Sequence, residues 1–269
     1  MANDLALFLQ HLVNQPAVLV TVAHGQGSVP REDGAWMAVS RDKVWGTVGG
    51  GHLEWQAIAQ ARDRLGIASA HWSHDMALGP SLGQCCGGRV RLLFEPLAAS
   101  QTQGLAERLR PLARPLALFG GGHVGRAIVS ALAPLPFAVR WIDSRDEIFP
   151  DQVPADVVCE HSDPVHAAVA DVAAGSRVLI MSFSHAEDLD VVQACLLRQR
   201  AQGDLPFVGL IGSQTKWATF RSRLRQRGFA DAELAHITCP IGVPGIVGKQ
   251  PAVIAAAVAA QLLMLDTSP

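Results

Sequence analysis

The stretch LALFGGGHVG, residues 116–125, decides the fold of the second half of the chain. Its glycines Gly120, Gly122 and Gly125 form a G-x-G-x-x-G pattern between an apolar strand and a helix. In this pattern the first glycine permits a tight turn, the second lets backbone amides approach a pyrophosphate, and the third lets the helix pack closely on the sheet. The stretch therefore predicts the first strand, turn and helix of a Rossmann-like domain.

The residues that follow extend this pattern toward a nucleotide site. Asp143 ends the next predicted strand, at the spacing expected for the acid that binds a ribose hydroxyl. The helix that starts near His123 adds partial positive charge for phosphates. Asp143 favours NAD, although Arg145 beside it is able to accept the extra phosphate of NADP. The alternative is that the glycines only make a tight turn, because a fold persists when its ligand changes. The predicted NAD-binding residues are Gly120, Gly122, His123, Gly125 and Asp143.

From residue 116 onward, apolar strands alternate with helices, which predicts a parallel sheet covered on both faces. The expected strands are 116–119, 138–142, 157–159, 178–183, 207–211 and 236–238, and the expected helices are 124–133, 166–173, 188–202, 214–227 and 252–265.

The first part of the chain has a different pattern, with short β-branched strands and a few helices. The expected helices are 4–13 and 53–65, and the expected strands are 17–23, 35–39, 44–48, 71–78 and 88–95. A proline-bracketed segment with a short helix, 104–110, follows and is typical of a linker. The predicted fold class is α/β: an N-terminal α+β domain at 1–98, a linker at 99–114, and a C-terminal Rossmann-like parallel-sheet domain at 115–269.

Composition narrows the class of protein. The chain has 269 residues, of which 49% are hydrophobic and 17% charged, and a net charge of −2, so it forms a core and has no basic excess for nucleic acid. Its most apolar segment, 252–265, is shorter than the roughly 20 residues of a membrane span, and no basic residue precedes the first apolar stretch as in a secretory signal. Five cysteines, one pair adjacent, do not form a disulfide framework. We expect a cytoplasmic protein.

Three glycine-dense loops mark the N-terminal domain, at residues 25–31, 49–54 and 83–88. Each loop carries chemically active side chains: Ser28 and Arg31, His52 and Glu54, Cys85 and Cys86. Several glycine-rich backbone stretches in one small domain predict close approach to a ligand. The triple glycine at 49–51 before a helix also predicts an anion-binding nest.

Several ordered motifs, spread over nearly the whole chain, resemble those of the XdhC/CoxI accessory proteins. The motifs are LVTVAHGQGSVPREDGAWMAV, GTVGGGHLEWQAIAQA and GQCCGGRVRLLFEP in the first domain, and LALFGGGHVGRAI, WIDSRDEIFP, the SH of MSFSHAEDLD, IGSQTKWATFRSRL and CPIGVPGIVGKQPAVIAAAVAAQLL in the second. One departure is the run at 248–255, where the family usually reads close to K-T-P-E-E-I-A and this chain lacks the acidic pair.

The resemblance implies a carrier and chaperone that is not an enzyme. Proteins of this family mature molybdenum hydroxylases such as xanthine dehydrogenase. They bind the molybdenum cofactor (molybdopterin), support its sulfuration by a cysteine desulfurase, and deliver it to the apo-hydroxylase. A homodimer is a further family-level expectation. Two rival readings remain: an NAD-dependent oxidoreductase with a catalytic cysteine or His185, and an NAD(H)-sensing regulatory module.

The thiols of Cys85 and Cys86 are soft ligands that suit molybdenum, and the family's CGG motif contains Cys86. The alternative for this pair is two small buried residues beside a turn. Arg31 is a candidate partner of the cofactor phosphate or else a surface cation. Glu54 is a candidate partner of the pterin or else a helix cap.

The remaining candidates are weighed in the same way. Ser28, Gly50 and Gly51 complete the predicted cofactor site of the first domain. His185 follows a strand end, where α/β folds bind ligands, and is otherwise a structural histidine. The His71–His74 pair lies in a strand-like stretch that separates the two rings, which disfavours a metal site. We expect Cys159, Cys195 and Cys239 to be inert core thiols.

Overall fold

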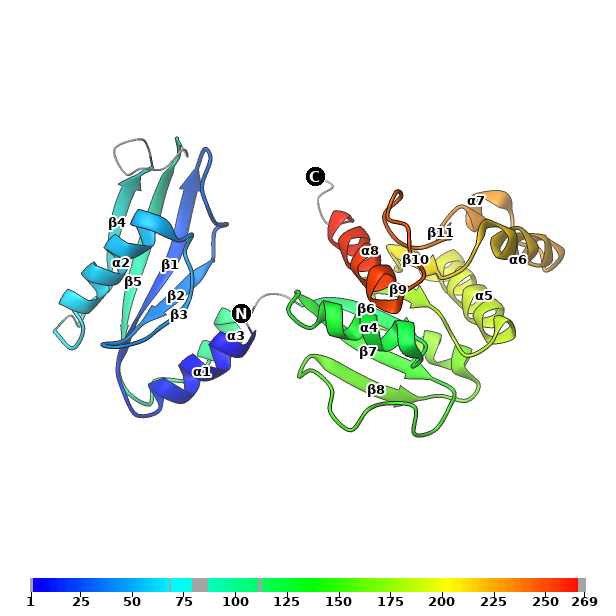
Figure 1. Cartoon of the computed structure of the whole chain (residues 1–269), viewed down its shortest axis with the longest axis horizontal. Helices are drawn as coiled ribbons and strands as arrows, with labels where there is room; N and C mark the ends of the chain where they lie inside the picture. Colours follow the sequence, from blue (N-terminus) through cyan, green and yellow to red (C-terminus); the bar gives the residue numbers. More distant parts are fainter. Residues whose placement is uncertain (1, 68, 79–86, 111–112, 266–269) are drawn as a thin grey trace. The chain divides into compact units, whose positions relative to one another are not determined.

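The computed structural model describes residues 2–67, 69–78, 87–110 and 113–265, and it divides into two compact units at residues 111–112. Figure 1 shows an antiparallel sheet with helices in the first unit and a parallel sheet between helices in the second. This confirms the predicted fold class.

The N-terminal unit is an antiparallel sheet with strand order β3-β2-β1-β5-β4. Its strands are β1 (Ala17–Gln26), β2 (Trp36–Val39), β3 (Val44–Gly46), β4 (Trp72–Ala77) and β5 (Arg89–Leu97), and its helices are α1 (Ala2–Leu12), α2 (Gly51–Asp63) and α3 (Leu105–Leu109). Alternate residues of β1 point to opposite faces, as the pleat requires. Val18 and Val20 pack in the core under α2, while Ala17 and Leu19 pack in the core formed with α1 and α3.

Most of the segment predicted as a linker belongs to this first unit. Leu105 and Leu109 of α3 are buried in its core, and the Trp36 indole donates to the Leu109 carbonyl at 3.1 Å. The apolar spacing of two leucines on one helix face was the signal for this packing.

The C-terminal unit has a parallel sheet with strand order β11-β10-β9-β6-β7-β8. The strands are β6 (Arg114–Phe119), β7 (Phe137–Asp143), β8 (Val157–His161), β9 (Arg177–Ile180), β10 (Phe207–Leu210) and β11 (Ile237–Thr238). The helical segments are α4 (His123–Leu132), the 3-10 helix η2 (Val165–Asp171), α5 (His185–Gln202), α6 (Gln214–Gln226), α7 (Asp231–Leu234) and α8 (Pro251–Met264). Residues of α4 and α8 pack in one core cluster, and residues of η2, α5 and α6 pack in another.

Three local features differ from the sequence-based prediction. The predicted helix 166–173 is a 3-10 helix, and β9 ends at Ile180. Helix α5 starts at His185, before the expected residue 188, because the Ser184 hydroxyl accepts from the Glu187 N–H at 3.2 Å and caps it. Helix α8 agrees with its predicted bounds to within one residue, begins with Pro251 at its first turn and has no acidic residue there.

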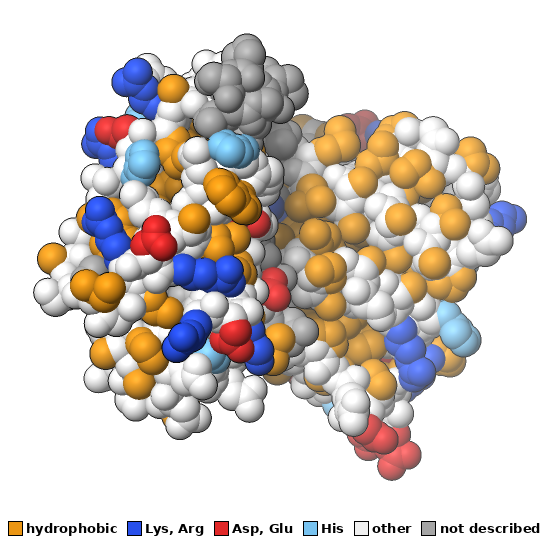
Figure 2. Space-filling model, turned by 60° about the vertical axis from the view of Figure 1, so that its left-hand side comes forward, with side chains coloured by type: hydrophobic (Ala, Val, Ile, Leu, Met, Phe, Trp, Pro, Cys, Tyr) orange, Lys and Arg blue, Asp and Glu red, His pale blue; other side chains and the backbone are white. Residues whose placement is uncertain are grey.

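Two features of the described residues concern membranes and charged partners: the apolar length of the helices and the charges on one face of the N-terminal unit. Among the helices in the described residues, none combines the length and apolar character needed to cross a bilayer. On the face of the N-terminal unit that Figure 2 shows, Lys and Arg side chains are interspersed with Asp and Glu. The described part of that face therefore carries no continuous basic patch.

The three glycines of the G-x-G-x-x-G pattern differ in whether packing requires them. A Cβ at Gly125 would overlap the Gly120 carbonyl oxygen, and a Cβ at Gly120 would overlap the Met181 carbonyl oxygen. A Cβ at Gly122 would meet no atom within 4 Å. Packing therefore requires Gly120 and Gly125, but leaves Gly122 open.

We expect Gly125→Ala to destabilise the protein by about 3 kcal/mol, because the new methyl meets a backbone oxygen that cannot move aside. Gly122→Ala is the matched control and should change the free energy of unfolding by less than about 1 kcal/mol. Urea unfolding followed by circular dichroism measures both. Equal losses in the two variants would contradict this account of the turn.

Candidate functional site

The described parts of the glycine-dense loops of the N-terminal unit lie together at one end of its sheet. A Cβ at Gly88 would lie 2.5 Å from the Ser28 carbonyl oxygen and 2.6 Å from that of Gln26. A Cβ at Gly27 would lie 3.3 Å from the Gly88 Cα. The backbone at 26–28 therefore packs directly on the backbone at 87–88, at a distance that excludes side chains.

The second loop joins this group through Pro30 and Arg31. A Cβ at Gly49 would lie 2.7 Å from the Pro30 Cβ, and the Arg31 guanidinium donates to the Thr47 carbonyl at 3.4 Å. The described parts of the three loops, residues 25–31, 47–51 and 87–88, are therefore neighbours. Cys85 and Cys86 lie outside the described residues.

Glu54 shapes the triple-glycine loop from inside. Its Oε2 accepts from the Val48 and Gly50 N–H groups at 3.1 Å each and from the Thr47 hydroxyl. The three glycines have φ values of 131°, 73° and 61°, a backbone that favours glycine. The predicted anion nest is therefore occupied by the chain's own carboxylate, as in the helix-cap alternative, and pterin binding by Glu54 stays a prediction.

Arg31 is held by its neighbour in sequence. The guanidinium donates to both oxygens of Glu32, at 3.1 and 2.9 Å, and this hydrogen bonding lowers the pKa of the Glu32 carboxyl to about 2. The Arg31 side chain is 20% exposed, whereas that of Glu32 is 69% exposed. Because Glu32 is well solvated, an anionic ligand is able to replace it at modest cost.

Open space borders these loops. Among the described residues, a Cβ at Gly50 or Gly87 would meet no atom within 4 Å. On the first turns of α2, the Trp55 ring is 65% exposed and stacks with the His52 ring at a centroid distance of 5.7 Å. Sequence reasoning missed Trp55. An exposed tryptophan next to a glycine-rich loop was the available signal.

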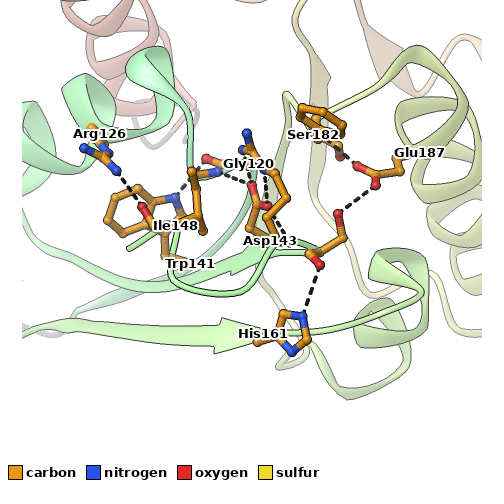
Figure 3. A network of polar contacts seen from close by, with 12 residues as sticks. Gly120, Arg126, Trp141, Asp143, Ile148, His161, Ser182 and Glu187 are labelled. Carbon is orange, nitrogen blue, oxygen red and sulfur yellow. Dashed lines mark hydrogen bonds and ion pairs between the residues drawn. The ribbon is translucent and has the colours of Figure 1, made fainter. Parts of the chain in front are cut away.

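Asp143, the predicted ribose ligand, has both carboxylate oxygens in contacts within the chain (Figure 3). Oδ2 accepts from the Gly121 N–H at 2.6 Å and from the Arg145 guanidinium at 2.9 Å. Oδ1 accepts from the Arg145 N–H and Nε, both at 2.9 Å. Burial raises the pKa of the Asp143 carboxyl, but these hydrogen bonds outweigh burial and hold the pKa below its ordinary value.

The other predicted residues of the C-terminal unit lie at the turn before α4 and at the start of α5. Gly120, Gly122 and Gly125 form the bend between β6 and α4, and His123 is exposed at the start of α4. His185 is exposed at the start of α5, with its ring edge-on to Phe220 at 6.4 Å. Nucleotide binding by this group stays a prediction.

A further polar group lies at the ends of β9 and β10, and the sequence analysis did not single out its buried member, Asp188. Asp188 is buried and accepts from the Ser182 N–H at 2.7 Å and from the Lys216 ammonium at 2.6 Å. Lys216 also donates to the Ile211 carbonyl at 2.9 Å. The ion pair therefore ties the loops after two neighbouring strands together.

Two models of protein families match this chain. The model described as the XdhC Rossmann domain matches residues 116–262, which is more than half of the chain, and the model of the XdhC and CoxI family matches residues 12–70. The chain belongs to the XdhC family. This confirms the resemblance seen in the sequence motifs.

Two of the similar proteins match nearly the whole length of this XdhC-family chain. YqeB of Escherichia coli K12 is 25% identical over 261 residues, which cover 95% of this chain and 44% of YqeB. The chain thus spans less than half the length of that relative. The crystal structure of a xanthine dehydrogenase from Bacillus halodurans superposes with a TM-score of 0.74 at 21% identity, covering 99% of this chain and 98% of that one. A Rossmann-fold NAD(P)-binding family protein from Shigella flexneri is 15% identical, with a TM-score of 0.36 over 58% of this chain and 88% of that one.

The described cysteines of this XdhC-family member are in poor positions for reaction. Cys195 is fully buried, which raises its thiol pKa to about 12, and burial raises that of Cys239 to about 11. Cys159, half-buried on β8, has a raised pKa for the same reason.

Within the described residues, no three His, Cys, Asp or Glu side chains are grouped to hold a metal ion. His74 instead contacts the Gln60 amide at 3.2 Å.

We expect Glu54→Ala to destabilise the N-terminal unit by about 2 kcal/mol, since it removes the acceptor of two backbone N–H groups and a hydroxyl. Glu54→Gln keeps an acceptor oxygen and should lose about half as much. Glu107→Ala, at an exposed site on α3, is the control and should change stability by less than about 0.5 kcal/mol. Urea unfolding of each variant measures the difference, and a Glu54→Ala variant as stable as the control would contradict the clamp.

Native protein treated with iodoacetamide at pH 8 should leave Cys195 and Cys239 unlabelled, because a thiol of pKa about 11 is roughly one-thousandth thiolate at that pH. Peptide mass spectrometry reads the labelling site by site, and protein unfolded in guanidinium chloride is the control. Rapid native labelling of Cys195 would show that its surroundings are open.

Proposed function

We propose that the N-terminal unit holds the molybdenum cofactor, and that the chain carries this cofactor through sulfuration and delivers it to xanthine dehydrogenase. The XdhC family is associated with maturation of that enzyme. The observation that carries the proposal is the convergence of residues 25–31, 47–51 and 87–88, where backbone packs on backbone around Arg31. Such loops let main-chain groups approach a ligand that side chains would exclude.

The positive charge of Arg31 suits the phosphate group of the molybdenum cofactor. The cofactor carries a phosphate, and a guanidinium binds a phosphate through two parallel N–H···O bonds. Arg31 already makes this kind of contact with the Glu32 carboxylate, whose side chain is solvated. In the proposed complex the phosphate takes the place of Glu32.

The open space beside the loops suits the molybdenum and the planar heterocycle of the cofactor. Gly50 and Gly87 leave room beside the loops, and Gly87 directly follows the Cys85–Cys86 pair in sequence. A thiolate from this pair is a soft ligand for molybdenum. The exposed Trp55 ring, stacked on His52, offers a flat face for a planar heterocycle.

In this proposal the chain binds and protects, and catalysis belongs to its partners. A cysteine desulfurase supplies the sulfur, and the apo-hydroxylase receives the product. The task of the chain is to keep water away from a labile sulfido ligand, which burial and pre-positioned donors achieve without turnover.

The test is purification of the full chain, without oxygen, from cells that make molybdopterin. We expect bound molybdenum by elemental mass spectrometry and pterin fluorescence after oxidation. Cys85→Ala together with Cys86→Ala, and separately Arg31→Ala, should each lower the bound pterin about tenfold, a loss of ~1.4 kcal/mol of binding.

Two matched controls accompany this test. Cys159→Ala removes a thiol from the C-terminal sheet, and Arg108→Ala removes an exposed guanidinium paired with Glu95 in the same unit as Arg31. Both should retain the wild-type cofactor content. Absence of molybdenum and pterin from the wild-type protein would overturn the proposal, and unchanged content in the double cysteine variant would remove the thiols from it.

A further inference from the structure

We infer that the crevice in which a Rossmann fold binds its dinucleotide is closed in this protein by the chain's own side chains, so that the C-terminal unit does not bind NAD(H) there. The inference concerns the second unit and does not depend on the proposed cofactor site in the first. It rests on the four hydrogen bonds that the Asp143 carboxylate accepts within the chain and on two contacts that cross the crevice.

The first observation is that Asp143 has no oxygen left for a ribose. A Rossmann acid accepts hydrogen bonds from ribose hydroxyls, and for this it needs a carboxylate facing the crevice. The Asp143 side chain is 1% exposed, and its two oxygens accept four hydrogen bonds from Gly121 and Arg145. The acid therefore holds the glycine loop to the end of β7 instead of facing a ligand.

The second observation is a pair of contacts over the end of β6. Strand β6 lies between β7 and β9 in the sheet, so the glycine loop that follows it is the switch point where nucleotides bind. The Ser144 hydroxyl, just after β7, donates to Glu187 of α5 at 2.7 Å (Figure 3). The Arg145 guanidinium lies 4.6 Å from the centroid of the Phe183 ring, which follows β9. Both contacts join segments on opposite sides of β6.

The charge at this crossing also opposes a dinucleotide. Glu187 is fixed by Ser144 through one oxygen and by the Phe183 N–H at 3.1 Å through the other. Its carboxylate therefore lies at the same edge of the sheet as the loop that would receive the pyrophosphate. Bringing two phosphates to this position adds like-charge repulsion and requires a buried ion pair to open.

Asp143, Ser144, Arg145, Phe183 and Glu187 together form a bar across the crevice. A dinucleotide would have to separate Arg145 from Asp143 and Phe183, and Ser144 from Glu187. The residues present do not fit NAD, even though the glycine pattern does.

The test is a titration of the full chain with NADH and with NADPH, followed by the fluorescence of the reduced nicotinamide. The wild-type protein should show no saturation up to about 1 mM of either nucleotide. Arg145→Ala removes one of the two hydrogen bonds that each Asp143 oxygen accepts and uncovers the loop, so this variant should bind at least about tenfold more tightly than wild type. Phe183→Ala removes a ring that is 64% exposed, so this variant should fold normally and bind more tightly as well.

The matched control is Arg200→Ala. Arg200 also pairs with a carboxylate, Glu233, through two nitrogens, and its guanidinium lies 4.7 Å from the centroid of the Phe229 ring. It sits near the other end of α5, roughly 22 Å from the first turn of that helix. This variant should behave as wild type, and circular dichroism checks that each variant is folded.

Saturable binding by the wild-type protein at micromolar NADH or NADPH would overturn the inference. If neither Arg145→Ala nor Phe183→Ala, both folded, gains any affinity over Arg200→Ala, the bar is not what excludes the nucleotide and the inference is also wrong. Loss of fold in Arg145→Ala leaves Phe183→Ala and the wild-type titration to decide it.

Discussion

In two glycine-rich turns of this protein, a carboxylate from the same unit accepts hydrogen bonds from the backbone N–H groups. Glycine loops lose much conformational freedom on folding, and buried N–H groups without a partner are costly. Glu54 meets this need for Val48 and Gly50 in the first unit, and Asp143 meets it for Gly121 in the second. The shape of both turns depends on these carboxylates, and so does the room that each turn leaves for a ligand.

The same constraint has opposite consequences in the two units. In the first unit Glu54 fills the nest from within, yet Gly50 and Gly87 still border open space and the carboxylate paired with Arg31 belongs to the solvated Glu32. In the second unit Asp143 forms an ion pair with Arg145, and the Arg145 side chain covers the glycine turn. The features that suit an anionic ligand therefore lie in the antiparallel unit, although the motif best known for binding nucleotides lies in the other. Fold and ligand are separate questions in this chain.

The architecture was predictable from the sequence because periodicity and turn residues report packing directly. The apolar strands, the G-x-G-x-x-G bend and the position of Asp143 at the end of β7 all match the structure. What the Asp143 oxygens bind was not predictable, since spacing places an acid but does not show its partners. The contact of Ser144 with Glu187 joins residues 43 positions apart and depends on the start of α5 at His185, which the Ser184 cap fixes. Cap geometry of this kind has little periodic signal.

The glycine fingerprint itself shows why its presence does not imply a bound dinucleotide. Gly125 is required because its Cα faces the Gly120 carbonyl, and Gly120 is required because its own Cα faces the Met181 carbonyl. Both demands come from the close packing of β6, α4 and β9, and they hold whether or not a ligand is present. Only Gly122 has space beside it that packing leaves unused. Two of the three glycines thus report the fold alone, and the ligand must be argued from the side chains beside the turn. Next to Gly121 these are Asp143 and its partner Arg145, which already bind each other.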